Sequence, residues 1–253
     1  GHGAWYQERM EYFRKLARDN RNEGLNGGNP WTMGLSPTDL ARMLQYHIDP
    51  SGYIFEGHEE NRLSGVTATV YYQAKDGTWV KWDSEAYDEG PNPNISDDEG
   101  CYGWDVLIGK WKVVFEKDGF FLAESQELDV PPPHMDVNIS MVSLNPATLS
   151  GVLAGPQGAY VDFTFDRPVL VEDVQKLAAV YFGGYAQPGT IEALDAGLTS
   201  NGNKQASSDH DLVAGMPVAR TFRFTPEEAF EVGASVCVRV GKGVLTYNGM
   251  ECQ

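Results

Sequence analysis

Residues 97–120 constrain the fold more than any other segment, because three turn signals there enclose two short stretches of strict alternation. Large apolar or aromatic side chains occupy every second position of both stretches: Tyr102, Trp104, Val106, Trp111, Val113 and Phe115. A period of two, bounded by Gly and Asp, is typical of antiparallel strands with one buried face. We therefore predict a mainly β fold in which Trp104 and Trp111 lie in the core.

The same pattern recurs along the chain from residue 48 onward. Alternating or β-branched segments occupy 53–55, 66–72, 78–82, 135–141, 160–165, 179–182, 190–194, 220–224 and 234–240. Turn signals separate them, including Asp49-Pro50-Ser51-Gly52, the hairpin-type pair Asp76-Gly77 and the polar, exposed loop expected at 197–211. Such short, regularly spaced strands predict two tandem antiparallel β-sandwich domains, at 48–142 and 143–253. The short connection 143–146 predicts little freedom between them.

Residues 1–47 differ in character from the rest of the chain. Apolar side chains recur at helical spacing in the first half of this segment: Tyr6, Met10, Phe13 and Ala17. The run Ser36-Pro37-Thr38-Asp39 carries the N-cap and first-turn signals of a second helix. We therefore predict a short helical cap or connector that packs on a neighbouring sheet.

The formal net charge of −17, from 36 acidic and 19 basic residues, limits the partners of the chain. Such a surface repels phosphate groups, so we expect no nucleic-acid partner, whereas cations and basic partners are favoured. No apolar run approaches the ~20 residues of a membrane-spanning helix, and we expect no membrane insertion within this segment. The N-terminus lacks the apolar region of a signal peptide, and we expect the segment to come from a longer polypeptide.

No arrangement of residues in the sequence predicts catalysis. The five histidines are scattered, no pair of carboxylates stands out, and nucleophile, metalloprotease and phosphate-loop motifs do not occur. We therefore expect no enzyme activity and no cofactor. Acidic loops at 83–89 and 97–99 offer the oxygen ligands that Ca²⁺ uses, but their spacing matches no EF-hand. A solvated loop is the simpler interpretation, with a calcium site as the alternative.

Three cysteines are too few for a disulfide framework. Cys237 and Cys252 could meet on neighbouring terminal strands, which would leave Cys101 unpaired. In the interpretation that we favour, all three are free and mostly buried thiols.

Two tryptophans are candidate ligand contacts. Trp79 and Trp82 lie three residues apart on one predicted strand, so alternation places them on opposite faces and at most one of them in the core. An exposed tryptophan offers a stacking surface for a sugar ring. We therefore take Trp79 and Trp82 as candidate ligand-binding residues.

Residues 48–142 resemble a carboxypeptidase-regulatory or transthyretin-like (prealbumin-like) module, related to the CNA-B repeats of bacterial surface proteins. The residues that carry this resemblance are Asp49-Pro50-Ser51-Gly52 and the segments 63–70, 96–104, 109–113, 117–120 and 137–139. Residues 143–253 resemble the Ig-like modules of large bacterial surface proteins, through 159–169, 221–226 and 233–249. Both resemblances imply β-sandwich folds, and such folds host many functions.

Some CNA-B modules contain an internal Lys–Asn isopeptide bond that a nearby acid assists. Asn138 occupies the place of the acceptor and Glu116 or Glu124 that of the acid, but the first core strand, 66–72, contains no Lys. We therefore predict that no such bond forms. The intact mass of the protein tests this prediction, because formation of the bond would release one ammonia.

The two resemblances together imply a segment of a large bacterial cell-surface or secreted protein, located outside the cell. We expect a non-catalytic structural and display role, as in a stalk or an adhesin, with flanking modules of the same polypeptide as partners. Two alternatives stay open. The segment could bind a glycan or a host protein, or it could be an accessory region of a secreted carbohydrate-active enzyme.

Overall fold

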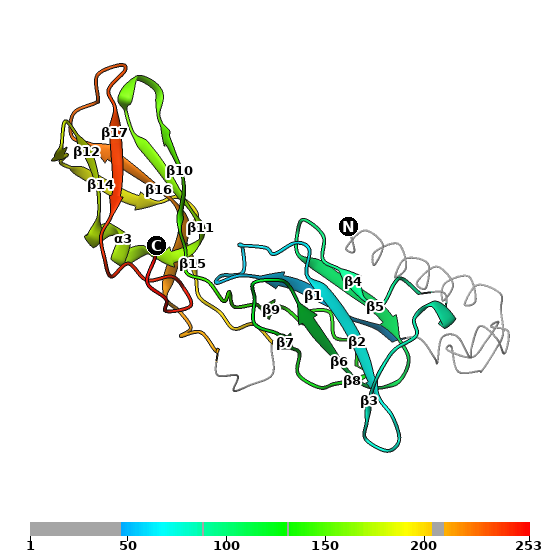
Figure 1. The fold of residues 1–253 in the computed structure, drawn as a ribbon. Coiled ribbons are helices and arrows are strands. Elements are labelled where there is room, and N and C mark those ends of the chain that lie inside the picture. The colour runs from blue at the N-terminus through cyan, green and yellow to red at the C-terminus, as the bar shows by residue number, and fades with distance from the viewer. Residues whose placement is uncertain (1–46, 88, 131, 204–209) are drawn as a thin grey trace, which may run out of the picture.

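The computed structural model describes residues 47–253 except 88, 131 and 204–209. The predicted helical segment, residues 1–47, lies outside this range apart from the backbone of its last residue. The described residues form a mainly β protein with several antiparallel sheets, gathered into two lobes (Figure 1). No helix among them is long and apolar enough to cross a membrane.

The first lobe contains two sheets. In one sheet the order is β5 (Cys101–Val106), β1 (His47–Phe55) and β9 (Ile139–Ser140). In the other the order is β3-β2-β6-β7, with β4 beside β2 and β8 beside β6. Its strands are β2 Thr67–Gln73, β3 Trp79–Lys81, β4 Asn94–Ile95, β6 Gly109–Glu116, β7 Ala123–Glu124 and β8 Leu128–Val130. A 3-10 turn, Glu85–Tyr87, lies between β3 and β4.

Buried side chains from both sheets form one cluster, which we call the first core. Trp104 of β5 and Trp111 of β6 belong to it, which confirms the prediction from alternation. Tyr102 and Phe115 meet edge to face with their ring centroids 5.0 Å apart, and this contact joins the two sheets. The Tyr102 hydroxyl donates a hydrogen bond of 2.6 Å to the Val137 carbonyl, which ties the segment before β9 to the core.

The prediction of a turn at Asp49-Pro50-Ser51-Gly52 is wrong, because these residues lie inside β1. The pairing of β1 with β5 shifts register between Ile48 and Ser51, so the run forms an irregularity within the strand. Gly52 allows a close backbone approach: a Cβ there would lie 2.3 Å from the Val137 carbonyl oxygen. The predicted strand 135–141 is also shorter than expected, since only β9 is regular.

The second lobe contains two further sheets and one short helix. The first sheet has the order β10-β11-β16-β14, with β15 beside β16, and the second has the order β13-β12-β17. The elements are β10 Leu149–Ala154, β11 Val161–Leu170, α3 Val171–Leu177, β12 Ala178–Phe182, β13 Tyr185–Ala186, β14 Gly189–Ala193, β15 Gly197–Leu198, β16 Pro217–Pro226 and β17 Val236–Val240. A 3-10 turn, Pro156–Gly158, connects β10 and β11.

The second lobe has its own cluster of buried side chains, the second core. Phe163 stacks on Phe222 with ring centroids 5.7 Å apart, and Phe165 meets Phe222 edge to face. The predicted alternation of 160–165 and 220–224 is thus confirmed. The segment 197–211 is not simply an exposed loop, since it begins with β15 and buries Thr199.

All three cysteines are free thiols in the structure. They are less buried than expected, because Cys101 and Cys252 are only half-buried and Cys237 is exposed on β17. Cys237 alternates with the inward-facing Val236 and Val238, which pack against the second core. Its position on the outer side of an edge strand therefore explains its exposure.

Replacement of Tyr102 by Phe tests the link between the first core and the segment before β9. The substitution keeps the buried ring and removes only the donor to the Val137 carbonyl. We expect a loss of about 1–3 kcal/mol in the free energy of unfolding, measured with chemical denaturant. Tyr185→Phe, at an exposed tyrosine, is the matched control and is expected to be neutral. Equal effects of the two substitutions would contradict the prediction.

Candidate functional site at the junction of the two lobes

The two candidate tryptophans occupy different environments. Trp82 is 4% exposed, and its indole contacts Trp111 edge to face at 5.3 Å and Tyr87 at 5.6 Å, so it belongs to the first core and not to a surface platform. Trp79 is half-buried on β3, and the Lys112 ammonium lies 5.1 Å from its ring centroid. Of the two, only Trp79 stays a candidate ligand contact.

The acidic loops use their polar groups to hold the backbone. The Asp97 Oδ1 atom accepts hydrogen bonds from the backbone amides of Glu99 and Cys101, at 3.0 and 2.8 Å. The Asn92 side chain bonds both backbone groups of Val70 and the Trp82 carbonyl. Within the described ranges no three His, Cys, Asp or Glu side chains gather in a way that could hold a metal ion.

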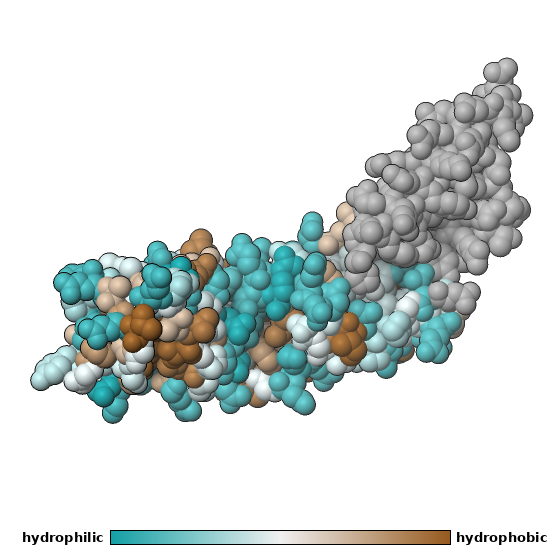
Figure 2. Space-filling view, turned by 90° about the horizontal axis from the view of Figure 1, so that it is seen from above, coloured by the Kyte–Doolittle hydropathy of each residue, from teal (hydrophilic) through white to brown (hydrophobic). Residues whose placement is uncertain are grey.

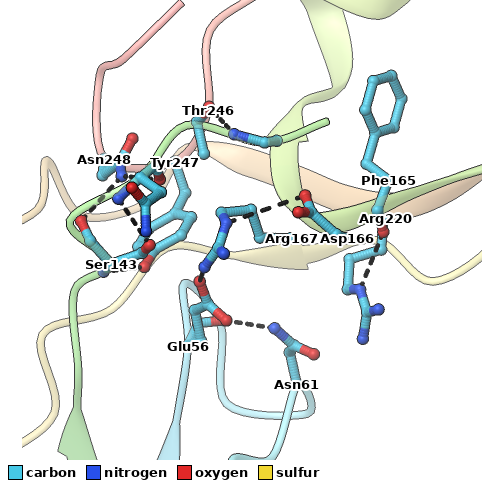
Figure 3. A network of polar contacts seen from close by, with 12 residues as sticks. Glu56, Asn61, Ser143, Phe165, Asp166, Arg167, Arg220, Thr246, Tyr247 and Asn248 are labelled. Carbon is cyan, nitrogen blue, oxygen red and sulfur yellow. Dashed lines mark hydrogen bonds and ion pairs between the residues drawn. The ribbon is translucent and has the colours of Figure 1, made fainter. Parts of the chain in front are cut away.

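A buried ion pair at the junction joins the two lobes. Glu56 follows β1 directly and is 6% exposed, and Arg167 comes from β11 of the second lobe. The Arg167 Nη1 atom lies 3.0 Å from the Glu56 Oε1 atom (Figure 3). The buried Tyr247 hydroxyl is hydrogen-bonded to the same carboxylate and accepts a 2.7 Å hydrogen bond from the Ser143 amide. These residues form what we call the junction network.

Burial dominates the electrostatics of the junction network. It raises the pKa of Glu56 above its ordinary value, although the Arg167 guanidinium and the Tyr247 hydroxyl both favour the charged form. Burial, with the Glu56 charge beside it, also raises the pKa of the Tyr247 hydroxyl. The network holds a carboxylate, a guanidinium and a phenol with no adjacent nucleophile–base pair. Its chemistry is therefore suited to fixing an orientation.

Backbone contacts also bring the two lobes together. His58 forms a β-bridge with Thr199, and the Ser200 amide donates to the Gly57 carbonyl at 3.1 Å. Ile139 likewise forms a bridge with Gly202. Gly202 has φ +63°, and a Cβ there would lie 2.3 Å from the Asn138 carbonyl oxygen. Only glycine fits this approach, so the 197–203 segment is docked closely on the first lobe.

Apolar contacts also join the two lobes at the junction. Four buried residues form a small cluster at the junction: Val142, Leu212, Val218 and Tyr247. Phe121 and Leu170 pack against it from the two lobes. The Phe121 ring also stacks on His210, with the ring centroids 3.5 Å apart. The junction thus combines an ion pair, backbone bridges and an apolar centre.

Sequence reasoning did not single out the junction network, and neither candidate tryptophan belongs to it. One signal was available, because Arg167 falls on the alternation of Phe163, Phe165 and Val169, where an apolar side chain is expected. A charged residue at a buried position requires a partner. Nothing in the sequence identifies that partner as Glu56, which is 111 residues away.

No protein-family model matches the chain, and no curated protein matches it either.

Single and double substitutions of the ion pair are expected to differ sharply. Arg167→Ala leaves the Glu56 carboxylate buried without its cation, and we expect a loss of about 3–5 kcal/mol in the free energy of unfolding. The double variant Glu56→Leu/Arg167→Met removes both charges at similar volume and is expected to lose far less. Denaturant unfolding of the three proteins measures the difference. A double variant as unstable as Arg167→Ala would contradict this account.

The raised pKa of Glu56 predicts that the stability of the protein depends on pH. Because its pKa is higher in the folded state than the ordinary 4.5, the folded protein binds this proton more tightly than the unfolded chain does. The contribution of Glu56 to stability is therefore greatest below pH 4.5 and falls as the pH rises through the raised pKa. Glu56→Gln lacks this dependence. We expect the stability of wild type relative to Glu56→Gln to decline across that window, and a flat or rising difference would contradict the prediction.

Proposed function

We propose that this chain is a non-catalytic structural and display segment of a large bacterial cell-surface or secreted protein. In this proposal residues 48–142 are a transthyretin-like β-sandwich and residues 143–253 an Ig-like β-sandwich. Two separate hydrophobic cores, each built from two sheets, support that division. The location outside the cell and the flanking modules of the same polypeptide are parts of the same proposal.

The junction is the observation that carries the proposal. Domains that move independently share small, polar interfaces. Here a buried ion pair, two β-bridges and an apolar cluster connect the lobes. Such a junction transmits force and keeps a fixed angle between its two ends. A stiff two-lobe rod suits a stalk that spaces and presents other parts of a polypeptide.

The distance distribution between two spin labels tests the stiffness. One label is placed on Lys81→Cys, on exposed β3, and the other on native Cys237, in a background with Cys101→Ser and Cys252→Ser. Pulsed electron spin resonance is expected to give one narrow distance distribution. A broad distribution for this protein would contradict a rigid spacer.

Two glycine substitutions in the same labelled protein test whether the junction causes the narrow distance distribution. Gly202→Ala introduces a methyl group against the first lobe, and we expect it to broaden the distribution. Gly77→Ala is the matched control: its φ of +87° carries the same backbone penalty, but nothing lies within 4 Å of the added Cβ. Equal effects of the two variants would remove the junction from the explanation.

A second candidate function is glycan binding at Trp79. Tyr71 of β2 pairs with Lys81 of β3 on one side and with Lys112 of β6 on the other. Gln73, two residues further along β2, pairs with Trp79 of β3. These aromatic and polar side chains therefore share one face of the sheet. Stacking on an aromatic ring with polar groups beside it is a recurrent way to hold a sugar. Saturable binding on a glycan array that Trp79→Ala abolishes would support this function, and binding to no glycan would reject it.

A further inference from the structure

Apolar side chains gather at the end of the second lobe that lies farthest from the junction. Three of the four most exposed large hydrophobic residues in the described ranges are there: Val232 (89%), Tyr185 (78%) and Leu153 (70%). Phe182, at the end of β12, is also exposed and pairs with Tyr185. Figure 2 looks down on the upper side of the molecule as drawn in Figure 1 and shows apolar residues concentrated on this lobe. We call these four residues the apolar tip.

Three connections between strands bring the apolar tip together. Phe230, in the loop between β16 and β17, lies with its ring centroid 6.1 Å from that of Phe182 and 6.4 Å from that of Phe224. Its backbone amide donates a 3.0 Å hydrogen bond to the Gly158 carbonyl in the β10–β11 turn. Gly158 has φ +70°, and a Cβ there would lie 2.1 Å from the Phe230 carbonyl oxygen. Packing and a backbone hydrogen bond therefore hold the β16–β17 loop, which carries Val232, against the β10–β11 turn and the end of β12.

Acidic residues flank Val232 in the loop between β16 and β17. Glu227, Glu228 and Glu231 are exposed in the same loop as Val232. None of them takes part in an ion pair with another described residue. Two arginines of the same lobe are engaged with other groups: Arg223 pairs with Asp162, and Arg239 lies over the Tyr181 ring. The tip thus offers apolar contact area with unpaired negative charge in the loop that carries Val232.

We propose that the apolar tip is a docking surface for a protein segment that presents apolar side chains flanked by Lys or Arg. Apolar area supplies the binding free energy, and the acidic rim selects a basic partner and accelerates its approach. A second copy of this chain carries the same negative charge and is repelled, as is any polyanion. The proposal deepens the display role and rests on it, because it places the partner surface at the outer end of the proposed rod.

Binding of three synthetic peptides to the full chain tests the proposal by isothermal titration calorimetry. The probe alternates Lys with Leu and Phe. One comparison peptide replaces each Lys by Glu, and the other replaces each apolar residue by Ser. Only the probe is expected to bind, and added salt is expected to weaken it.

Surface variants separate a specific site from general attraction to an acidic protein. Tyr185→Ser/Val232→Ser is expected to weaken probe binding by about tenfold or more, and Glu228→Gln/Glu231→Gln by a smaller factor. Val213→Ser is the matched control, since Val213 is comparably exposed but lies outside the tip, and it is expected to bind as wild type does. The substituted side chains of Tyr185, Val232, Glu228 and Glu231 are all exposed. Thermal unfolding checks that each variant is folded.

Three results would overturn the proposal: no binding of the probe, equal binding of the Ser or Glu peptide, or undiminished binding to Tyr185→Ser/Val232→Ser. None of them bears on the stiffness of the junction, which the spin-label distances measure independently. Failure of the docking site and failure of the proposed spacer role are therefore distinguishable.

Discussion

The Glu56 carboxylate and the Arg167 guanidinium meet where the lobes join, and the relative position of the lobes depends on that contact. Burial raises the pKa of Glu56, although Arg167 and Tyr247 favour its charged form. A buried ion pair is weak evidence for stability, and its clearer contribution here is the contact that it makes between the lobes. The Glu56 carboxylate is the more buried of the two groups, so an altered arrangement of the lobes that removed Arg167 would leave this carboxylate without its cation.

The other junction contacts reinforce the same geometry. The bridges from His58 to Thr199 and from Ile139 to Gly202 are directional backbone interactions that add to the ion pair. Several contacts together resist rotation in a way that one contact cannot. With the lobes held in this way, the apolar tip and the Trp79 face of β3 lie toward opposite ends of the molecule (Figure 1). In the proposed display role, this arrangement gives one body with distinct surfaces at its two ends.

The strands and much of the two cores could be predicted from the sequence. Period-two alternation placed Trp104, Trp111 and Phe163 inside because one face of each strand must be buried. The errors arose where distant segments meet. The Asp49–Gly52 run resembles a turn, yet Gly52 lies inside β1 because another backbone segment passes 2.3 Å from the position of a Cβ. Trp82 lies in the core because Trp111 and Tyr87 enclose it, and neither contact is visible from spacing.

By itself the sequence determined where strands form, which of their faces are buried and that the surface is strongly acidic, because these follow from residue type and local periodicity. Only the tertiary structure decided that Glu56 meets Arg167, that Gly202 docks on Asn138 and that Phe182 meets Phe230. Each of these contacts joins residues far apart in sequence, and their partners depend on how whole sheets pack. Local sequence patterns do not specify how sheets pack, so the junction and the apolar tip could be identified only from the three-dimensional structure.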